Sequence, residues 1–540
     1  MKNKPLLVLI LVVLLMSGCI TPIQSPPGQP TPVPAVETPA ALAEAASSIV
    51  QESLTAHPWQ WTTFVSPAEQ FAVATPQKYQ LTFNADGTVI IGADCNNVQG
   101  QYTLDDSNNI SIQVGPTTLM ACPDDSRAEQ FAQLLGGTAI IEIAEEGMLL
   151  GLTNGSNSML FSAALPTASE LCGEQALALN TIEDTLEPKV SAELDQMLVG
   201  FLQVGYRSAP GAAMLIITPD GRYFKSTGVA DVTTCAPLPA DSAYQIGSNT
   251  KLMTSVIIFQ LQEEGVLATA DLLSKWLPEL AATLPNGDQI TIDMLLTHTS
   301  GLYDYFDVQT NAGAIADGTH DKAMLTRAFT PEDLVKRVAD SGQMYFAPGA
   351  EGQWHYSNTG YILLGLVIEK ATGKSYEENL RTRIFEPLGL QQTYLLTGQP
   401  EPGTLPQAYY QPPFSYTTSE WNASQGWSAG AVVSTPDDFA VFLKTLFTGK
   451  LYQQPATLDL MKAHSAAGVD ALGPGTIYAH GMLDNQGVLG HGGQTLGFQS
   501  DGGYIPDKDV TIVIWSNSAT NMVTRTAIPT IAALVAGNEQ

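Results

Sequence analysis

The stretch Ala243-Tyr-Gln-Ile-Gly-Ser-Asn-Thr-Lys251 decides how the larger part of this chain is interpreted. It joins an extended segment to a strongly helical run that begins at Leu252, and it contains the only Ser-x-x-Lys of the chain. A serine at a helix start lies beside unpaired backbone N–H groups and the positive end of the helix dipole. Residue i+3 shares its helix face, so the Lys251 ammonium can reach and activate the Ser248 hydroxyl. Taken alone, the pattern more commonly means a capping serine with a solvated lysine.

Two further motifs have the residue types that this chemistry needs. Tyr356-Ser-Asn358, the only Tyr-x-Asn of the chain, stands directly before a predicted helix. A tyrosine near a lysine can take a proton and an asparagine amide can bind a substrate carbonyl, although a packed tyrosine and a capping asparagine would also explain the motif. Gly490-His-Gly-Gly493 precedes a late pair of strands, where glycines allow close approach of a substrate; alone it indicates a turn.

The order and spacing of the three motifs favour the catalytic interpretation over these simpler ones. Together they resemble the class C β-lactamase and D-alanyl-D-alanine carboxypeptidase superfamily of serine hydrolases, over roughly two-thirds of the chain. The flanking stretches agree: Leu296-Thr-His-Thr-Ser-Gly-Leu302, Phe346-Ala-Pro-Gly349, Tyr356-Ser-Asn-Thr-Gly-Tyr361, Pro387-Leu-Gly-Leu390 and Ser428-Ala-Gly-Ala-Val-Val-Ser-Thr-Pro436.

The resemblance implies a role for each motif residue. Ser248 would attack the carbonyl, Lys251 would polarise its hydroxyl, and Tyr356 would carry the proton to the leaving group and help to activate water. The backbone N–H groups of Ser248 and Gln494 would form the oxyanion hole. Asn358, His491, Gly492 and Gly493 would contact the substrate, and His298 would support the helical part rather than act as a base. The titrations of Lys251 and Tyr356 would be coupled, so the sequence leaves the identity of the base open.

Two departures from the β-lactamase pattern bear on the substrate. His491 stands where β-lactamases have a lysine, and it carries less charge at neutral pH. Gly492 replaces a threonine whose hydroxyl could bind a carboxylate. We therefore expect a D-alanyl-D-alanine carboxypeptidase-like enzyme acting through an acyl-enzyme on a small acyl donor. An esterase or a weak β-lactamase is the alternative within the same chemistry. A catalytically inactive cell-surface binding protein is the alternative from another class.

The expected architecture is multidomain. From residue 187 to 540, strands near both ends enclose amphipathic helices, which indicates an α+β fold with an antiparallel sheet flanked by helices and a helical subdomain. Residues 51–165 are β-rich, beginning with a hairpin at Tyr79–Ile91. Trp59-Gln-Trp61, Ala93-Asp-Cys-Asn96, Gly100-Gln-Tyr102 and Thr118-Leu-Met-Ala-Cys122 resemble the META (HslJ-like) domain, which implies an accessory role. Residues 166–186 are expected to be a linker.

The first fifty residues indicate export. Lys2 and Lys4 precede an apolar run and Met16-Ser-Gly-Cys19, which together resemble a lipoprotein signal peptide, residues 1–18, with Cys19 as the lipidated residue. A plain secretory signal is the alternative. Residues 19–50 are Pro-rich and predict an extended tether. We expect an extracytoplasmic protein held on the bacterial membrane by a lipid anchor.

The remaining cysteines are Cys95, Cys122, Cys172 and Cys235. Export permits disulfides, and Cys95–Cys122 with Cys172–Cys235 keeps each pair inside one domain; unpaired thiols are the alternative. No spacing suggests a metal site, and no cofactor is required. The formal charge of −30 and the absence of a Lys/Arg cluster make nucleic-acid binding very unfavourable.

Overall fold

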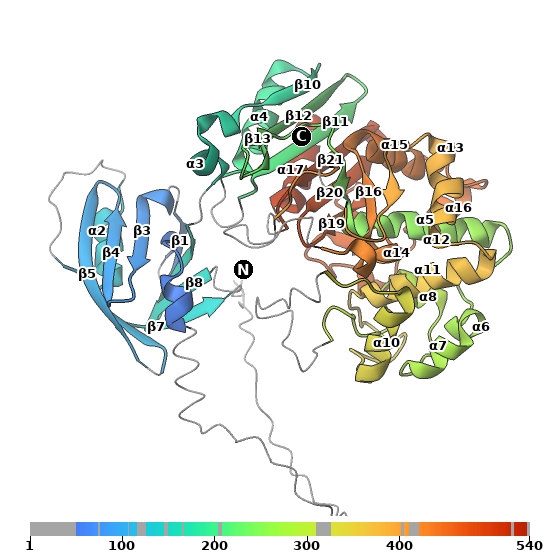
Figure 1. Ribbon diagram of the computed structural model, residues 1–540, viewed down its shortest axis with the longest axis horizontal. Helices are drawn as coiled ribbons and strands as arrows, with labels where there is room; N and C mark the ends of the chain where they lie inside the picture. Colours follow the sequence, from blue (N-terminus) through green and yellow to red (C-terminus); the bar gives the residue numbers. More distant parts are fainter. Residues whose placement is uncertain are drawn as a thin grey trace, which may run out of the picture.

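The computed structural model describes two folded units, a barrel and a larger sheet-and-helix domain (Figure 1). The described residues are 50–67, 69–73, 76–105, 107–115, 126–144, 149–164, 167–203, 208–308, 326–400, 404–409, 421–519 and 523–536. The predicted signal peptide, Cys19 and nearly all of the tether lie outside them. None of the described helices is long and apolar enough to cross a bilayer.

The first unit is an antiparallel sheet closed into a barrel. Its strand order is β2-β1-β3-β4-β5-β6-β7-β8-β9, and β1 also pairs with β9. The strands are β1 (Trp59–Val65), β2 (Gln70–Ala72), β3 (Tyr79–Phe83), β4 (Thr88–Ala93), β5 (Asn96–Leu104), β6 (Asn109–Gln113), β7 (Gly137–Ala144), β8 (Leu149–Asn154) and β9 (Asn157–Ala163). The predicted hairpin is β3–β4, where Tyr79 pairs with Ala93.

Alternation along the strands fills the barrel interior. In β3 every second side chain is buried, which is the period-2 pattern of a sheet with one buried face. The helix α2 (Ala128–Leu135) contributes Phe131, which is fully buried and stacks on Trp61 with ring centroids 5.1 Å apart. Aromatic side chains thus occupy the space that the closed sheet encloses.

The second unit is built on an antiparallel sheet whose central strands come from opposite ends of the domain, as the sequence predicts. Its order is β10-β12-β11-β21-β20-β19-β18-β17, with β13 paired to β12. The strands are β10 (Asn180–Asp184), β11 (Gly211–Thr218), β12 (Gly221–Asp231), β13 (Ala236–Pro237), β17 (Thr476–Tyr478), β18 (Leu483–Asn485), β19 (Val488–Gln494), β20 (Gln499–Ile505) and β21 (Val510–Ser516).

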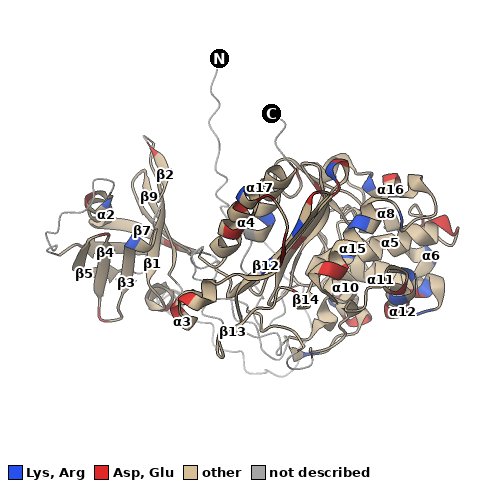
Figure 2. Ribbon diagram, turned by 90° about the horizontal axis from the view of Figure 1, so that it is seen from above, with Lys and Arg blue, Asp and Glu red and all other residues tan. Residues whose placement is uncertain are grey.

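Helices cover both faces of this sheet (Figure 2). On one face α4 (Pro188–Gly200) and α17 (Val523–Val535) pack in one apolar cluster with β11, β12 and β21. The opposite face carries the helical part, with α5 (Thr250–Glu263), α6 (Leu273–Trp276), α7 (Pro278–Thr283), α8 (Ile292–Leu296), α10 (Pro331–Ser341), α11 (Asn358–Thr372), α12 (Tyr376–Leu380), α13 (Glu386–Leu388), α14 (Trp427–Gly430), α15 (Pro436–Phe447) and α16 (Pro455–Lys462).

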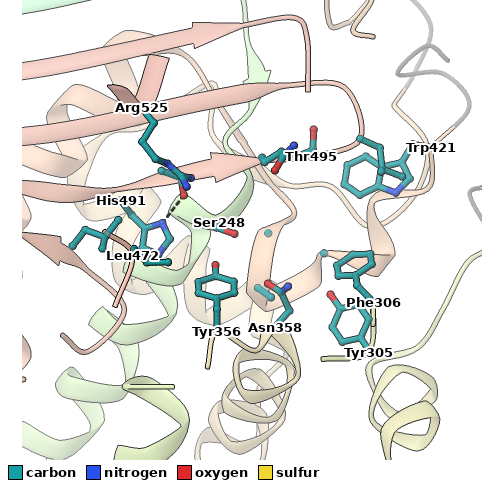
Figure 3. A pocket seen from close by; sticks show the side chains of 17 residues that line it. Ser248, Tyr305, Phe306, Tyr356, Asn358, Trp421, Leu472, His491, Thr495 and Arg525 are labelled. Carbon is teal, nitrogen blue, oxygen red and sulfur yellow. Dashed lines mark hydrogen bonds between the residues drawn. The ribbon is translucent and has the colours of Figure 1, made fainter. Parts of the chain in front are cut away.

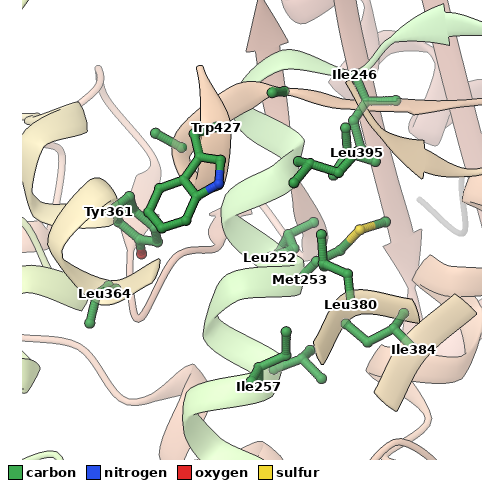
Figure 4. Packing of buried hydrophobic residues seen from close by; sticks show 14 of the residues in the cluster. Ile246, Leu252, Met253, Ile257, Tyr361, Leu364, Leu380, Ile384, Leu395 and Trp427 are labelled. Atoms are coloured by element: carbon green, nitrogen blue, oxygen red, sulfur yellow. The ribbon is translucent and has the colours of Figure 1, made fainter. Parts of the chain in front are cut away.

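The helix α5 lies at the centre of the larger apolar cluster (Figure 4). Leu252, Met253 and Ile257 are fully buried, and neighbours on several sides include Tyr361 of α11 and Leu380 of α12. A helix that is apolar around its whole circumference is a core helix. Each such side chain contributes about 1.5–3 kcal/mol of burial free energy, so the start of α5 is held firmly in place.

The prediction that residues 166–186 form a linker is wrong. Residues 168–172 form α3 (Ala168–Cys172), and a 3-10 turn follows at Glu174–Leu177. The edge strand β10 pairs with β12, with Asn180 opposite Ser226. Ala168 and Ala176 are buried in the cluster of α4 and α17. This segment belongs to the second domain because its small apolar side chains complete that core.

One predicted disulfide lies wholly within the described residues. Cys172 and Cys235 are bonded, which links α3 to the turn that follows β12. Cys95 is also disulfide-bonded, and Cys122 lies outside the described residues.

Candidate active site

The nucleophile candidate lies on a tight turn between a small sheet and α5. Ser248 is the middle residue of the 3-10 turn η4 (Gly247–Asn249). The sheet order is β14-β16-β15, formed by β14 (Tyr244–Gln245), β15 (Tyr394–Leu395) and β16 (Val432–Ser434), and it holds the preceding residues in place. Gly247 has φ +52°, and a Cβ there would lie 2.7 Å from the backbone nitrogen of Gln494. The turn therefore requires glycine before the serine.

Lys251 is completely buried and its ammonium nitrogen lies within hydrogen-bond distance of three oxygens. Nζ is 3.0 Å from Ser248 Oγ, 2.7 Å from Asn358 Oδ1 and 2.7 Å from the carbonyl oxygen of Ala429. None of these partners carries a charge. Burial therefore lowers the pKa of Lys251 to about 7, against a smaller opposing effect of Asp304.

Asp304 fixes the orientation of the Asn358 amide. Its Oδ2 accepts the backbone N–H of Asn358 at 2.6 Å and the side-chain Nδ2 at 2.9 Å. Because Nδ2 faces this carboxylate, Oδ1 must face Lys251. One Nδ2 hydrogen remains for a substrate. The predicted substrate-binding residue is thus first of all a partner of the lysine.

This geometry determines where the lone pair of neutral Lys251 points. Asn358 Oδ1 and the Ala429 carbonyl oxygen can only accept, so the two N–H bonds of a neutral amine are directed at them. The lone pair then faces Ser248 Oγ. The cluster can accept the serine proton without rearrangement.

Tyr356 stands on the other side of the nucleophile. Its hydroxyl is hydrogen-bonded to Ser248, and its ring centroid is 4.9 Å from Lys251 Nζ. Burial raises the pKa of Tyr356, against the smaller effect of the Ser248 hydrogen bond. The phenol therefore stays protonated at neutral pH and can donate.

Close approach of β19 brings the two predicted oxyanion-hole amides toward each other. A Cβ on Gly493 would lie 1.9 Å from the carbonyl oxygen of Ile246, so any side chain at 493 would push the strand away from the nucleophile turn. Ser248 and Gln494 both line the resulting pocket. Two backbone N–H groups in this arrangement would suit a developing oxyanion.

Arg525 occupies the space next to Gly492. A Cβ on Gly492 would lie 2.4 Å from Asp501 Oδ1 and 2.6 Å from Arg525 Nη2. The guanidinium, from the first turn of α17, is paired with Asp501 of β20, with Nε 3.5 Å from Oδ1. The missing threonine at 492 is therefore what makes room for an arginine at the pocket.

The pocket has two unlike ends with Ser248 between them (Figure 3). It encloses about 410 Å³. Arg525, His491 and Leu472 lie toward one end, and Trp421, Phe306 and Tyr305 toward the other. Among the described residues, no group of three or more His, Cys, Asp or Glu side chains is placed to hold a metal ion.

The structure brings the predicted site residues together and adds several that the sequence analysis missed. Ser248, Tyr356, Asn358, His491, Gly492 and Gln494 all line one pocket, with Lys251 beneath it. Asp304, Tyr478 and Arg525 had no sequence signal, because none of them belongs to one of the three motifs. His298 is buried beside Tyr356, with ring centroids 4.3 Å apart, in keeping with a supporting position.

Comparison with known proteins identifies both units. The Beta-lactamase family model matches residues 194–537, and the META domain model matches residues 52–164. Among curated relatives, the chain is 27% identical to the D-alanyl-D-alanine-carboxypeptidase/endopeptidase AmpH of Escherichia coli over 65% of this chain and 89% of that protein. It is 31% identical to the esterase EstB of Burkholderia gladioli over 42% of this chain and 56% of that protein.

A solved structure shares the fold of the second domain. The D-stereospecific amidohydrolase from a Streptomyces species is 27% identical, with a TM-score of 0.55 over 64% of this chain and 99% of that one. The resemblances expected for both parts of the sequence are confirmed. Because the first family model spans more than half of the sequence, the chain is a member of the Beta-lactamase family of hydrolases, and it carries a META domain ahead of the family domain.

Proposed function

We propose that this protein is an extracytoplasmic serine hydrolase that forms an acyl-enzyme at Ser248, with D-alanyl-D-alanine carboxypeptidase-like activity. The observation that carries the proposal is the set of oxygens around Lys251. They leave its lone pair directed at Ser248 Oγ, at 3.0 Å, while burial lowers its pKa to about 7. A base with this pKa suits proton transfer at neutral pH.

The proposed acylation moves one proton from the nucleophile to the leaving group. Neutral Lys251 takes the Ser248 proton as the oxygen attacks the carbonyl carbon. Tyr356 donates its phenolic proton to the leaving nitrogen or oxygen, and the proton on Lys251 then restores the phenol. In deacylation a water molecule takes the place of the leaving group, and the same residues transfer protons in the opposite sense.

The carboxypeptidase-like specificity rests on Arg525. A D-alanyl-D-alanine substrate ends in a carboxylate on its leaving-group side. His491 offers that carboxylate no charge, because burial lowers its pKa to about 3. The Arg525 guanidinium lines the same end of the pocket, and it is the cation that could bind the carboxylate.

The first test is detection of the covalent intermediate. The purified soluble protein lacking residues 1–48 is incubated briefly with a D-Ala-D-Ala peptide thioester or a penicillin, and its intact mass is measured. We expect an adduct equal to the acyl group, absent from Ser248→Ala. A folded protein with neither adduct nor turnover would refute the carboxypeptidase-like activity.

An esterase is the second candidate, and the apolar lining of the pocket favours it. Trp421, Phe306, Leu472, Leu483 and Leu496 offer contacts to an uncharged acyl chain, and Asp501 offsets part of the Arg525 charge. Arg525→Ala separates the two functions. For a carboxypeptidase, kcat/KM for the D-Ala-terminated substrate should fall by about 10-fold or more while that for a short neutral ester is retained. Equal retention for both substrates would favour the esterase.

The proposed location rests on the lipoprotein-like signal and on the disulfide between Cys172 and Cys235. The test expresses the full chain in bacteria supplied with a radiolabelled fatty acid. Label should appear on the protein and disappear in Cys19→Ala. Label retained in that variant, or absent from both proteins, would contradict the anchor.

A further inference from the structure

His298 is hydrogen-bonded to the segment that carries Tyr356 and Asn358. Its Nδ1 accepts the backbone N–H of Ser357 at 3.2 Å, and its own carbonyl oxygen accepts the backbone N–H of His355 at 3.2 Å. Ser357 is the middle residue of the Tyr-x-Asn motif. The ring and backbone of one buried histidine therefore hold both ends of the segment that aims Tyr356.

The other ring nitrogen of His298 begins a path to β19. Nε2 lies 2.9 Å from the hydroxyl of Tyr478, and this hydroxyl lies 3.2 Å from Nε2 of His491. His491 Nδ1 in turn bonds the carbonyl oxygen of Gly492, the contact drawn as a dashed line in Figure 3. His298, Tyr478 and His491 are all buried.

The fixed partners at the two ends determine every proton in this path. A backbone N–H can only donate, so His298 Nδ1 is unprotonated and its Nε2 carries the hydrogen. At the far end a carbonyl oxygen can only accept, so His491 Nδ1 carries the hydrogen and its Nε2 is unprotonated. The Tyr478 hydroxyl therefore receives from His298 and donates to His491. All hydrogen bonds run in one direction.

We propose that His298, Tyr478 and His491 form a one-way hydrogen-bond relay of positioning residues, which ties the Tyr356–Asn358 segment to the strand carrying the Gln494 amide and holds both histidines neutral. His491 is then a positioning residue rather than a ligand of the substrate carboxylate. A second proton on His298 would lie on Nδ1, opposite the backbone N–H of Ser357, and one on His491 would lie on Nε2, opposite the hydrogen that Tyr478 donates. The relay and protonation of either ring therefore exclude one another.

The surroundings of the two rings also disfavour their protonation. The charged or titratable groups that face them are Lys251 from α5, Tyr361 from α11, His355 and Tyr356 from the loop before α11, and Arg525 from α17. Tyr361 also hydrogen-bonds the Tyr478 hydroxyl. Asp501 of β20 lies opposite Gly492, where it accepts a hydrogen bond from Thr524 and pairs with Arg525. Burial lowers the pKa of His298 well below its usual value, and the charge of Lys251 lowers it further. In the relay, each ring nitrogen of the two buried, neutral histidines has a hydrogen-bond partner.

The relay has a spectroscopic signature that needs no substrate. The chain contains seven histidines, so ¹⁵N-histidine labelling gives a tractable spectrum, and His298→Gln and His491→Asn assign the two rings. At about pH 5 we expect both rings to be neutral and in opposite tautomers, Nε2–H in His298 and Nδ1–H in His491. The same tautomer in both rings, or a doubly protonated ring, would overturn the proposal.

Tyr478→Phe removes the central hydroxyl and keeps the ring. Both rings stay buried and neutral, so we expect the change in the ¹⁵N signals of the two nitrogens that lose their partner, Nε2 of His298 and Nε2 of His491. Tyr376→Phe is the matched control, because Tyr376 is equally buried and its hydroxyl bonds Thr254 outside the pocket. The control should leave both rings unchanged. Unaltered Nε2 signals of both histidines in Tyr478→Phe would contradict the relay.

A kinetic measurement tests the positioning role, and this part alone rests on the serine acylation proposed above. In Tyr478→Phe the acylation rate constant of Ser248 with a penicillin or an ester should fall by roughly 10- to 100-fold with little change in the non-covalent affinity. An unchanged rate constant would show that the relay does not position the reacting groups. If wild-type protein is acylated by no probe, the proposed function fails, and the histidine spectra still decide the relay.

Discussion

Two buried lysines of the second domain lie in opposite electrostatic environments. Among the described residues, the oxygens within hydrogen-bond distance of Lys251, at the start of α5, are all neutral, at 2.7–3.0 Å. Lys225 of β12 lies beneath α4 with Asp184 at 2.7 Å and Asp195 at 2.8 Å. Burial alone would lower the pKa of both, but the two carboxylates outweigh it at Lys225 and raise its pKa. Burial with charged partners makes a structural ion pair, whereas burial without them makes a base.

The largest expected effect separates the two lysines by chemistry. Lys251→Arg keeps a cation but removes a group that can lose its proton at neutral pH. Acylation of Ser248 should slow by roughly 10²–10⁴-fold, the usual contribution of a general base. Lys225→Arg is the matched control and should leave the rate unchanged. The acylation rate constants of both variants are measured by stopped flow. An equal decrease in both would contradict a specific role of Lys251 as the base.

For folding stability, in contrast to the acylation rate, we expect the larger loss when Lys225 is replaced. Lys225→Met leaves two carboxylates without their cation, and breaking a largely buried ion pair costs about 3–5 kcal/mol. Lys251→Met leaves the oxygens of Asn358 and Ala429 without this donor, at about 1–3 kcal/mol each, but it also removes the cost of burying the amine. Because these two effects oppose each other, the net loss should be smaller than in Lys225→Met. Urea unfolding followed by tryptophan fluorescence compares the two variants. A larger loss in Lys251→Met would contradict the comparison.

The pH dependence of stability should have opposite signs at the two sites. Between its folded pKa of about 7 and the unfolded value of 10.5, Lys251 is protonated only in the unfolded chain, so its contribution to stability rises with pH. For Lys225 the folded pKa is the higher one. Its stabilisation is fully present below 10.5 and is lost as pH rises through the folded value. Unfolding curves of wild type and both Met variants across this range test the signs.

The smallest expected effect concerns Asp304, a carboxylate that acts on the Lys251 pKa. Asp304→Asn removes the charge that partly opposes the lowering of the Lys251 pKa, so the acid limb of the acylation rate should move to lower pH. The amide oxygen can still accept from Asn358, which limits the loss of geometry. A limb that moves to higher pH would show that Asp304 acts in some other way.

Much of the site could be predicted because its residues fall in short motifs. Ser248 and Lys251 share one helical turn, and Tyr356 and Asn358 stand together at the start of another helix. Asp304, Tyr478 and Arg525 could not be predicted, because an aspartate in a loop, a tyrosine in a short strand and an arginine on a helix are ordinary solvated or packed residues in sequence. The fold brings Arg525 to the pocket, and it brings Asp304 and Tyr478 to Asn358 and His491, which line the pocket. Only tertiary structure creates their roles.

The domain boundary failed for a related reason. The strand β10 is an edge strand in which four of five positions are exposed, so it lacks the alternation of apolar residues that marks a strand in sequence. The predicted hairpin is β3–β4, and in β3 every second side chain is buried, which is the pattern that marks a strand in sequence. A buried element has a periodic pattern of apolar residues that can be recognised in the sequence, whereas an exposed element such as β10 lacks this pattern.

The pairing of β11 with β21 has a consequence for biosynthesis. Ala213 is opposite Trp515, so the centre of the sheet joins segments made roughly 300 residues apart. While the ribosome is still producing the helices, β11 has no partner on that side, and the nucleophile turn has no β19 against it. The second domain therefore cannot close its sheet until translation is far advanced, whereas all strands of the barrel have been made by residue 163.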